Sequence, residues 1–258
     1  MLAVLLILAP VIVFLTSVVP TNEWWSYVIV CVLACGAFLM HWFAVTCDPG
    51  IIPPAPSGSP DVQPGKITLA DGTEIDEKVC ASCNIVRPPK SSHCVNCDYC
   101  VQEYDHHCGV LGSCVARRTF RFFTLYFYFL VPLSLFVLIR SIVVLATTDY
   151  RSSLLHEGHY GRWKVVAAAG CVLYGGCASC GVIMQLGMYT DLACKNETTK
   201  IQTQSRRLKL PPHQRGGSTV VYATDVDPEH STRSCGSCLH RLFGPLEPSR
   251  VISTADVV

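Results

Sequence analysis

The chain has 258 residues and a net charge of +1; half of its residues are hydrophobic, and only 15% are charged. Soluble domains usually carry about 25% charged residues, so this composition, with a mean hydropathy of +0.36, indicates a membrane protein. The near-neutral charge gives no support to a nucleic-acid-binding role, which usually requires a strongly basic surface.

Four apolar segments each approach or exceed the roughly 20 residues that a helix needs to cross the hydrocarbon core. In chain order they cover about residues 1–19, 25–45, 122–147 and 165–189. Four segments of this length argue against buried helices of a soluble core. The first segment has neither a basic stretch before it nor a clear small-residue cleavage site, so we expect a retained helix rather than a signal peptide.

Basic residues predict the orientation of these spans. The loop of residues 47–119 carries six Lys or Arg residues, and more follow the fourth span. The loop between the first two spans carries none, and the loop between the last two carries Arg151 and Arg162. By the positive-inside rule, we expect residues 47–119 and the C-terminal tail to be cytosolic, where a reducing compartment keeps cysteines free.

The polar parts of the chain differ in composition. Residues 48–65 are rich in Pro, Gly and Ser and read as an extended linker. In residues 66–77, Asp71-Gly72 stands between two short alternating runs, which predicts a β-hairpin. The tail, residues 201–258, shows little periodicity, and we expect much of it to be mobile.

Potential metal ligands are concentrated between Cys80 and Cys114, which hold seven of the 16 cysteines and three histidines. The spacing is C-x2-C-x9-H-C-x2-C-x2-C, followed by Asp105-His106-His107-Cys108 and then Cys114. Paired C-x2-C knuckles suit tetrahedral zinc, because two thiolates from one tight turn can hold a single ion. Two closed zinc sites need eight ligands and therefore leave two of these ten residues over.

Two balanced Cys3His sites would leave one cysteine and one histidine, which is the minimum set for a thiol nucleophile with its base. Asp105, next to them, is placed to orient the imidazole. Counting does not identify which Cys and which His are spare. A purely structural zinc module is the alternative; the mixed charge of the segment and its tether between two membrane spans disfavour nucleic-acid binding.

These residues resemble the cysteine-rich domain of the DHHC protein S-acyltransferases, or palmitoyltransferases. The similarity rests on the full Cys and His pattern, the tetrad at 105–108, and Arg117-Arg118 followed by Phe123. Asp48-Pro49-Gly50 looks like the family's DPG motif, and Thr198-Thr199 like the start of its TTxE motif. The resemblance implies an all-α membrane protein with four transmembrane helices and a cytosolic, cysteine-rich, two-zinc β-hairpin domain between helices 2 and 3.

The resemblance also divides the chain into five parts. These are transmembrane helices 1 and 2 (1–46), a cytosolic linker with the DPG motif (47–79), the DHHC cysteine-rich zinc domain (80–123), transmembrane helices 3 and 4 (124–192) and a cytosolic tail (193–258).

Residue roles follow from the resemblance as expectations. One zinc ion would be held by Cys80, Cys83, His93 and Cys100, and the other by Cys94, Cys97, His107 and Cys114. Cys108 would be the nucleophile, His106 its base and Asp105 the residue that orients His106. Thr199 would contact Asp105, and Asp48 belongs to the DPG motif.

The implied reaction carries a long-chain fatty acyl group, such as palmitoyl, from acyl-CoA to Cys108 and then to a cysteine of a substrate protein. The implied partners are acyl-CoA, membrane lipid and membrane-associated proteins with cytosolic cysteines. The implied location is an endomembrane, with the Golgi as the family's commonest site.

The chain departs from the family pattern at several positions. Gly109-Val110-Leu111-Gly112-Ser113 replaces the usual Pro-Trp-Val-Asn-Asn, Thr119 stands where Asn is usual, and Ile201 stands where TTxE has Glu. None of these changes removes a metal ligand or a member of the Asp-His-Cys set. They bear on rate and acyl-CoA preference, and they leave a weakly active or inactive zinc-stabilised membrane scaffold or chaperone as the alternative function. A cysteine hydrolase would share the nucleophile, but it needs water access and an oxyanion site, and the sequence indicates neither.

Overall fold

The computed structural model describes residues 2–68, 74–88, 90–148, 158–208 and 235–245. Met1–Trp42 and Phe122–Tyr189 form one compact unit, and Phe43–Arg121 with Thr190–Val258 forms a second. The first unit is helical, and the second contains the short strands. The Asp71-Gly72 turn lies outside the described residues.

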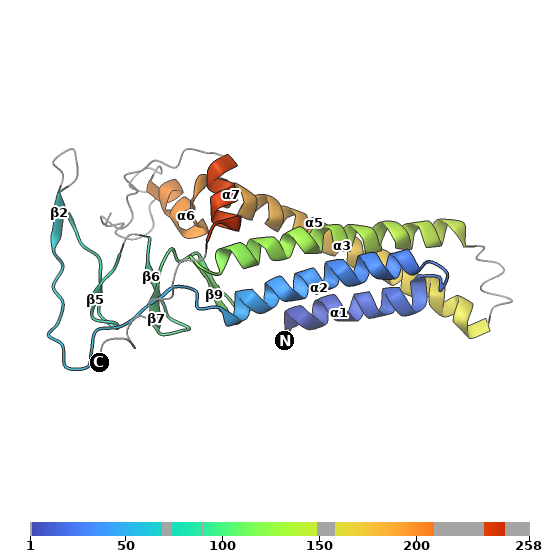
Figure 1. Cartoon of the computed structure of the whole chain (residues 1–258), viewed down its shortest axis with the longest axis horizontal. Helices are drawn as coiled ribbons and strands as arrows, with labels where there is room; N and C mark the ends of the chain where they lie inside the picture. Colours follow the sequence, from blue (N-terminus) through green and yellow to red (C-terminus); the bar gives the residue numbers. More distant parts are fainter. Residues whose placement is uncertain (1, 69–73, 89, 149–157, 209–234, 246–258) are drawn as a thin grey trace. The chain divides into compact units, whose positions relative to one another are not determined.

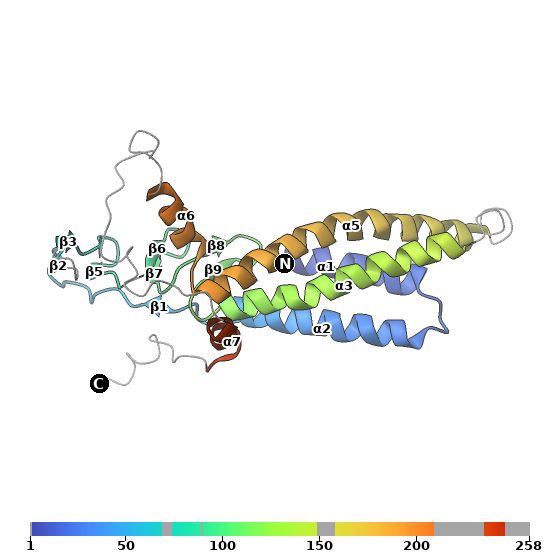
Figure 2. The ribbon, with the colours of Figure 1, turned by 90° about the horizontal axis from the view of Figure 1, so that it is seen from above.

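The helical unit is built from α1 (Leu2–Val13), α2 (Trp24–Thr46), α3 (Phe120–Thr147) and α5 (Gly158–Lys195), which run alongside one another (Figures 1 and 2). Three of them, α2, α3 and α5, are long and apolar enough to cross a membrane.

The predicted first span is shorter than expected. It consists of α1 followed by a π-helical stretch, η1 (Phe14–Val18). The apolar part, Leu5–Val18, has fewer than 18 residues and extends only roughly 21 Å at 1.5 Å per residue, against about 30 Å for the hydrocarbon core. A membrane span at this first segment, and with it a total of four spans, therefore stays a prediction.

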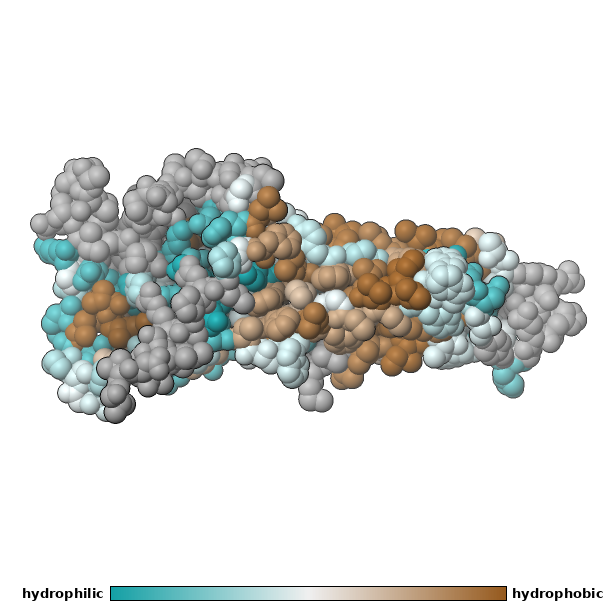
Figure 3. Space-filling model, in the orientation of Figure 1, coloured by the Kyte–Doolittle hydropathy of each residue, from teal (hydrophilic) through white to brown (hydrophobic). Residues whose placement is uncertain are grey.

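These helices expose many large apolar side chains in addition to those that they bury. Val32 is 61% exposed, and Leu173 and Met184 are each 74% exposed. Figure 3 shows hydrophobic residues covering the visible face of the helices. Because water would penalise such a surface and lipid would not, this surface fits a hydrocarbon environment.

Two glycines set how closely the helices approach. A Cβ on Gly36 of α2 would lie 2.4 Å from the ring of Phe129 on α3, so this contact needs a glycine. A Cβ on Gly175 of α5 would lie 3.3 Å from Leu138 of α3. Small residues on α2 and α5 thus bring both helices against α3.

An ion pair joins two apolar segments near the short loop between η1 and α2. Arg140 of α3 donates a hydrogen bond to the carboxylate of Glu23, and its guanidinium lies 5.1 Å from the ring centroid of Trp25. A charge on a long apolar helix is costly unless it is paired. Arg140 therefore has a structural partner.

Within its described residues, the second unit contains nine short strands, all paired antiparallel. They are β1 (Ile51–Ile52), β2 (Lys66–Thr68), β3 (Glu74–Asp76), β4 (Val79–Cys80), β5 (Ile85–Val86), β6 (Ser92–Cys94), β7 (Tyr99–Val101), β8 (His106–Cys108) and β9 (Ser113–Val115). The pairs β2–β3, β4–β5, β6–β7 and β8–β9 are hairpins. Strand β1 pairs with β7 and extends the β6–β7 hairpin to a three-stranded sheet in the order β1-β7-β6. Strands β2 and β3 are the hairpin that the sequence predicted around residues 66–77.

The tail contains two helices that the sequence did not predict. The first, α6 (Thr199–Leu208), begins at Thr198, whose hydroxyl accepts a hydrogen bond from the backbone N–H of Ile201 as an N-cap. The second, α7 (Cys235–Phe243), packs with Leu242 only 3% exposed.

Candidate active site and metal centres

Three consecutive hairpins share one design with a 14-residue period. In each hairpin, the first strand ends at a cysteine that pairs with a residue on the other side of a four-residue turn. Cys80 pairs with Ile85, Cys94 with Tyr99 and Cys108 with Ser113. The last turn residue has a positive φ in each hairpin, at Asn84 (50°), Asp98 (56°) and Gly112 (69°). Asn, Asp and Gly are the residues that tolerate this left-handed conformation, so local sequence accounts for the turns.

The third hairpin lacks one feature of the other two. Cys83 and Cys97 occupy the third position after the opening cysteine, whereas Leu111 occupies it in the third hairpin and is 8% exposed. The backbone is otherwise alike, since the N–H of Asp98 donates to the carbonyl of Cys94 and that of Gly112 to the carbonyl of Cys108, both at 2.8 Å. Cys108 therefore opens a knuckle that has no second thiol.

Strand alternation sorts the ligands between two sites. On β6 and β7, His93 lies directly opposite Cys100, and Cys94 points to the other face. On β8 and β9, His107 lies opposite Cys114, and Cys108 and His106 share the other face. Each site takes two cysteines from one hairpin and a cross-strand His–Cys pair from the next. A third site would need a further hairpin after β9, but α3 begins there instead.

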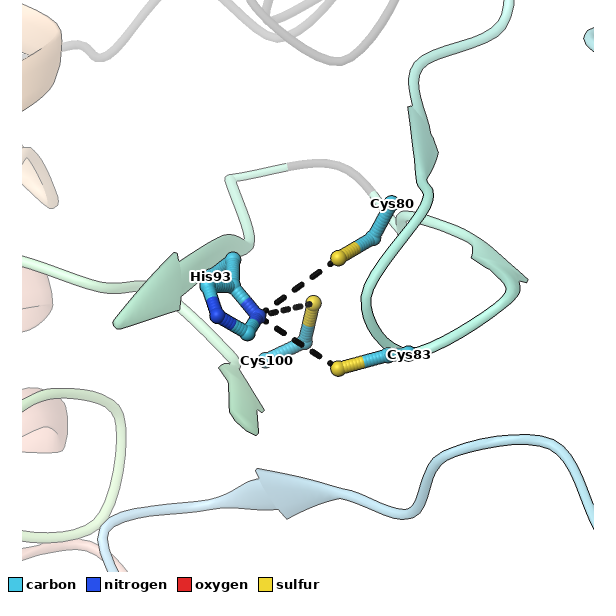
Figure 4. A group of neighbouring side chains, drawn as sticks. All are labelled: Cys80, Cys83, His93 and Cys100. Carbon is cyan, nitrogen blue, oxygen red and sulfur yellow. Dashed lines mark hydrogen bonds between the residues drawn. The ribbon is translucent and has the colours of Figure 1, made fainter. Parts of the chain in front are cut away.

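The first cluster joins the first two hairpins. The Nδ1 of His93 faces three sulfur atoms, at 3.4 Å from Cys83, 3.5 Å from Cys80 and 4.0 Å from Cys100 (Figure 4). The other ring nitrogen of His93 lies 3.5 Å from a carboxylate oxygen of Asp98, which favours Nδ1 as the ligand atom.

The second cluster joins the second and third hairpins. The Nδ1 of His107 lies 3.3 Å from the sulfur of Cys97, 3.6 Å from Cys94 and 3.8 Å from Cys114. In a tetrahedral zinc site, with Zn–S of about 2.3 Å and Zn–N of about 2.0 Å, ligand atoms stand about 3.5 to 3.8 Å apart. Both clusters fit this spacing, with all ligand atoms of each within 4.8 Å of one another, so both could hold a metal ion.

The clusters are also the core of this module. Cys80, Cys83 and Cys100 pack with Ile52, and Cys94 and Cys114 pack with Val101 and Ala116. Few purely apolar residues are buried with them, and so small a core stabilises a fold weakly. Metal binding would therefore supply much of the folding free energy.

Asp105, His106 and Cys108 form a connected group, in which His106 and Cys108 lie on the face of β8 opposite His107 and Asp105 directly precedes the strand. The Nδ1 of His106 donates to a carboxylate oxygen of Asp105 at 2.7 Å, and the Asp105 side chain has no exposed surface. His106 in turn interacts by a hydrogen bond with Cys108. The order of carboxylate, imidazole and thiol is that of a nucleophile with an oriented base.

The pKa shifts of His106 and Cys108 both favour the charged form of the side chain. Burial lowers the pKa of His106, but its hydrogen bonds with Asp105 and Cys108 outweigh burial and raise the pKa to about 9. Burial raises the pKa of Cys108, but hydrogen bonds with His106 and with the backbone of Leu111 and Val110 outweigh it, so the pKa lies below its ordinary value. A thiolate beside an imidazolium is the reactive form of such a pair.

The contact expected between Thr199 and Asp105 is made by the main chain. The backbone N–H of Thr199, at the first turn of α6, donates to the second carboxylate oxygen of Asp105. A helix N-terminus favours a negative charge, so α6 stabilises the carboxylate. Nearby, Lys200 of α6 donates a hydrogen bond to the hydroxyl of Ser92 on β6.

Asp48 has a structural position instead of a place among the reactive groups. Its carboxylate accepts hydrogen bonds from the backbone N–H groups of Gly50 and Ile51, both at 2.9 Å, and from Arg118 at 2.8 Å. It thereby fixes the turn that leads into β1. Thr119 ties β9 to the start of α3, because its buried hydroxyl accepts from the N–H of Ala116 and donates to the carbonyl of Cys114.

Two features of this site were not predicted from the sequence. One is the 14-residue hairpin period, which was visible in the spacing of Cys80, Cys94 and Cys108. The other is Arg241 on α7, which contacts Glu103 and Glu197, each two residues before a member of the Asp105–Thr199 hydrogen bond. No local pattern marks Arg241, since its role depends on where a distant helix packs.

Comparisons with known proteins agree with the geometry. The model of the DHHC palmitoyltransferase family matches residues 73–206, which is more than half of the chain. Palmitoyltransferase ZDHHC18 of Mus musculus is 27% identical over 238 residues, covering 83% of this chain and 59% of the relative. Palmitoyltransferase ZDHHC9 of Bos taurus is 30% identical over 172 residues, covering 67% and 43%, and palmitoyltransferase erf2 of Emericella nidulans is 29% identical over 191 residues, covering 67% and 31%.

The chain thus spans less than two thirds of the length of these curated relatives. The match includes the three hairpins, both Cys–His clusters, the Asp105–His106–Cys108 group and helices α3 and α5. Together with the membrane-capable helices, it makes the protein a multi-pass membrane protein. The chain belongs to the DHHC palmitoyltransferase family.

Proposed function

We propose that the chain is a protein S-acyltransferase that carries a palmitoyl or similar long-chain acyl group from acyl-CoA to cysteines of membrane-associated proteins. The observation that carries this proposal is the hydrogen-bonded series Asp105–His106–Cys108, in which His106 and Cys108 lie on the face of β8 opposite the expected metal ligand His107. A structural zinc module has no need for a spare thiol beside an imidazole whose orientation a buried carboxylate fixes.

In the first step, the Cys108 thiolate attacks the carbonyl carbon of the acyl-CoA thioester, and His106 holds the proton that Cys108 has given up. The C–S bond to CoA then breaks, and His106 returns that proton to the leaving CoA sulfur. Asp105 keeps Nδ1 protonated, so that Nε2 is the atom that exchanges the proton.

In the second step, His106 removes the proton from a substrate cysteine, whose sulfur attacks the acyl carbon on Cys108. The substrate forms a new thioester, and Cys108 leaves as a thiolate beside the protonated His106. One thioester replaces another in each step, so positioning and thiolate formation are the main demands on the protein.

The metal in this proposal is zinc, one ion in each Cys3His cluster, and its contribution is to fix the hairpins. Cys80, Cys83, His93 and Cys100 would hold one ion, and Cys94, Cys97, His107 and Cys114 the other. His107 and Cys114 would anchor the hairpin that carries Cys108, and so fix the nucleophile relative to its base.

The membrane arrangement in this proposal has four spans, with residues 47–119 and the tail in the cytosol, in a Golgi or related endomembrane. The exposed apolar side chains of the helices support this arrangement. The same surroundings would favour an acyl chain, by about 0.8 kcal/mol for each CH2 that is buried. The excess of Lys and Arg in residues 47–119 and in the tail supports the proposed orientation.

The decisive experiment is labelling of the purified protein with an alkyne analogue of palmitoyl-CoA, followed by hydroxylamine. Wild type should carry hydroxylamine-sensitive label, whereas Cys108→Ser should carry none and should keep its zinc. Cys47→Ser is the matched control, since Cys47 is also partly exposed but lies outside the hairpins. Zinc-loaded wild type without label would overturn the proposal and favour the scaffold.

A further inference from the structure

The C-terminal helix α7 lies outside the region that matches the family, yet it packs on the residues around Asp105. Its C-terminal end is held by Arg121, which donates to the carbonyl of Gly244 at 2.6 Å and to that of Pro245 at 3.2 Å. A Cβ on Gly244 would lie 2.4 Å from the carbonyl oxygen of His240, so the helix ends at a position that requires glycine.

Arg241 of α7 is the residue that reaches inward, and its side chain is only 9% exposed. One of its terminal nitrogens donates to the carbonyls of Glu197, at 2.7 Å, and Leu192, at 3.3 Å. The other lies 3.7 Å from a carboxylate oxygen of Glu103. The guanidinium stacks 4.0 Å from the ring centroid of Phe120. A planar, multiply donating group is needed to make all four contacts at once.

These contacts bracket the hydrogen bond between Asp105 and Thr199. Glu103 lies two residues before Asp105, and Glu197 lies two residues before Thr199. Arg241 therefore holds both chain segments that meet at this bond. Between Glu197 and the end of α5 stands Asn196, whose positive φ of 51° marks a sharp turn. Without the guanidinium, the carbonyls of Leu192 and Glu197 would lose its hydrogen bonds, and the turn would lose a constraint.

We propose that Arg241 is a positioning residue for acyl transfer, which holds Thr199 and Asp105 in register so that Asp105 can orient His106. The tail helix is then part of the active-site support. The expected effect on rate rests on the proposed function, whereas the hold of Arg241 on the Thr199 and Asp105 segments does not.

The test is a double-mutant cycle in the full-length protein, reconstituted in lipid nanodiscs. Wild type, Arg241→Ala, Asp105→Asn and the double variant are compared by single-turnover autoacylation over a range of palmitoyl-CoA concentrations. Arg241→Ala should lower the rate at saturation by about tenfold, as loss of a supporting contact typically does, with the half-saturating concentration unchanged. The double variant should be no slower than Asp105→Asn, because both changes act through one group.

Lys195→Ala is the matched control. Lys195 lies near the same turn and forms a partly exposed ion pair with Asp191, four residues before it on the same helix, so its replacement should leave the rate unchanged. A multiplicative slowing in the double variant, or a change confined to the half-saturating concentration, would overturn the proposal. If Arg241→Ala loses zinc, Arg241→Gln enters the same cycle; loss of zinc there too would make Arg241 a folding residue and refute positioning.

Hydrogen–deuterium exchange separates this proposal from the proposed function. The segment around Thr199 should exchange faster in Arg241→Ala than in Lys195→Ala, whether or not any acyl group is transferred. Faster exchange with an unlabelled wild type would retain the positioning role and refute the transferase. Unchanged exchange in Arg241→Ala, together with normal acyl labelling of the wild type, would refute the positioning role and retain the transferase.

Discussion

Asp105→Asn removes a charge from a side chain that has no exposed surface and that joins two elements of the site. The carboxylate accepts from Nδ1 of His106 at 2.7 Å and from the backbone N–H of Thr199. An asparagine has one oxygen and one NH2 group, so it can accept from only one of these donors. If the NH2 faces His106, the imidazole must carry its proton on the other nitrogen and can no longer take one from Cys108. If the NH2 group faces Thr199 instead, it opposes the backbone N–H of Thr199, and two hydrogen-bond donors meet in a buried site.

The magnitude follows from the hydrogen bond that is lost. A bond to a charged group contributes roughly 1.5 to 3 kcal/mol, and each 1.36 kcal/mol corresponds to tenfold in rate, so the expected loss is about 10- to 150-fold. The equivalent change in a serine protease triad, about 10⁴-fold, sets an upper bound, because there the base must deprotonate an alcohol. A thiol is more acidic, and Cys108 already has a lowered pKa.

The measurement is single-turnover labelling of Asp105→Asn at saturating palmitoyl-CoA, with zinc content as the folding control. The zinc content should equal that of wild type, since Asp105 is not a member of either cluster. A rate within about threefold of wild type, on zinc-loaded protein, would refute the reasoning, because the buried carboxylate would then have no part in orienting His106.

Three further predictions follow from the same geometry. His107→Ala should lose zinc and fold poorly, whereas His106→Ala, one residue away on the opposite face of β8, should keep its zinc and lose labelling; equal zinc loss in both would contradict the alternation of faces. Leu111→Cys should complete a third C-x2-C knuckle, so that added zinc inhibits labelling and mild chelation restores it; labelling that is indifferent to zinc would argue against the repeat. Alkylation of Cys108 by iodoacetamide should have its pH midpoint below that of glutathione, because the pKa of the thiol is lowered, and His106→Ala should move that midpoint upward; a midpoint at or above that of glutathione would contradict the lowered pKa.

Composition and segment length predicted the membrane-capable helices because lipid imposes one simple rule, a long apolar stretch. The predicted spans near 25–45, 122–147 and 165–189 correspond to α2, α3 and α5, with bounds that extend by several residues. The first apolar segment shows the weakness of the rule. Its helix changes to a π-helical stretch at Phe14, and hydropathy does not detect this.

The eight expected metal ligands fall into two clusters because short-range spacing determines them. A C-x2-C turn and a cross-strand His–Cys pair are both local features, and antiparallel pairing at fixed register brings them together. Counting could not identify the spare pair, but the hairpin period can. Cys108 opens a knuckle with Leu111 in the place of its second cysteine, and α3 follows β9 directly, in the place where a further hairpin would have to supply a His–Cys pair.

Long-range contacts explain what sequence alone did not provide. The family resemblance predicted the contact of Thr199 with Asp105, but the spacing of the residues did not, because Thr199 supports Asp105 across 94 residues through a backbone N–H that any residue except proline could supply. Arg241 reaches Glu197 from a tail helix in a segment whose composition indicated mobility. Neither contact leaves a periodic pattern, because one side chain or one amide suffices at each end.

The departures from the family pattern after Cys108 can now be separated into two kinds. Leu111 and Gly112 have structural positions, one buried in the place of a knuckle cysteine and the other at a positive φ. Gly109 and Val110 do not: a Cβ on Gly109 would meet no described atom within 4 Å, and Val110 is 49% exposed. The ligands and the Asp105–His106 pair therefore make no use of a side chain at either position, although the backbone of Val110 contributes to the hydrogen bonds of Cys108. The loss of the usual Pro-Trp thus changes the surface that would meet acyl-CoA beside Cys108, and leaves intact the machinery that would activate the thiol.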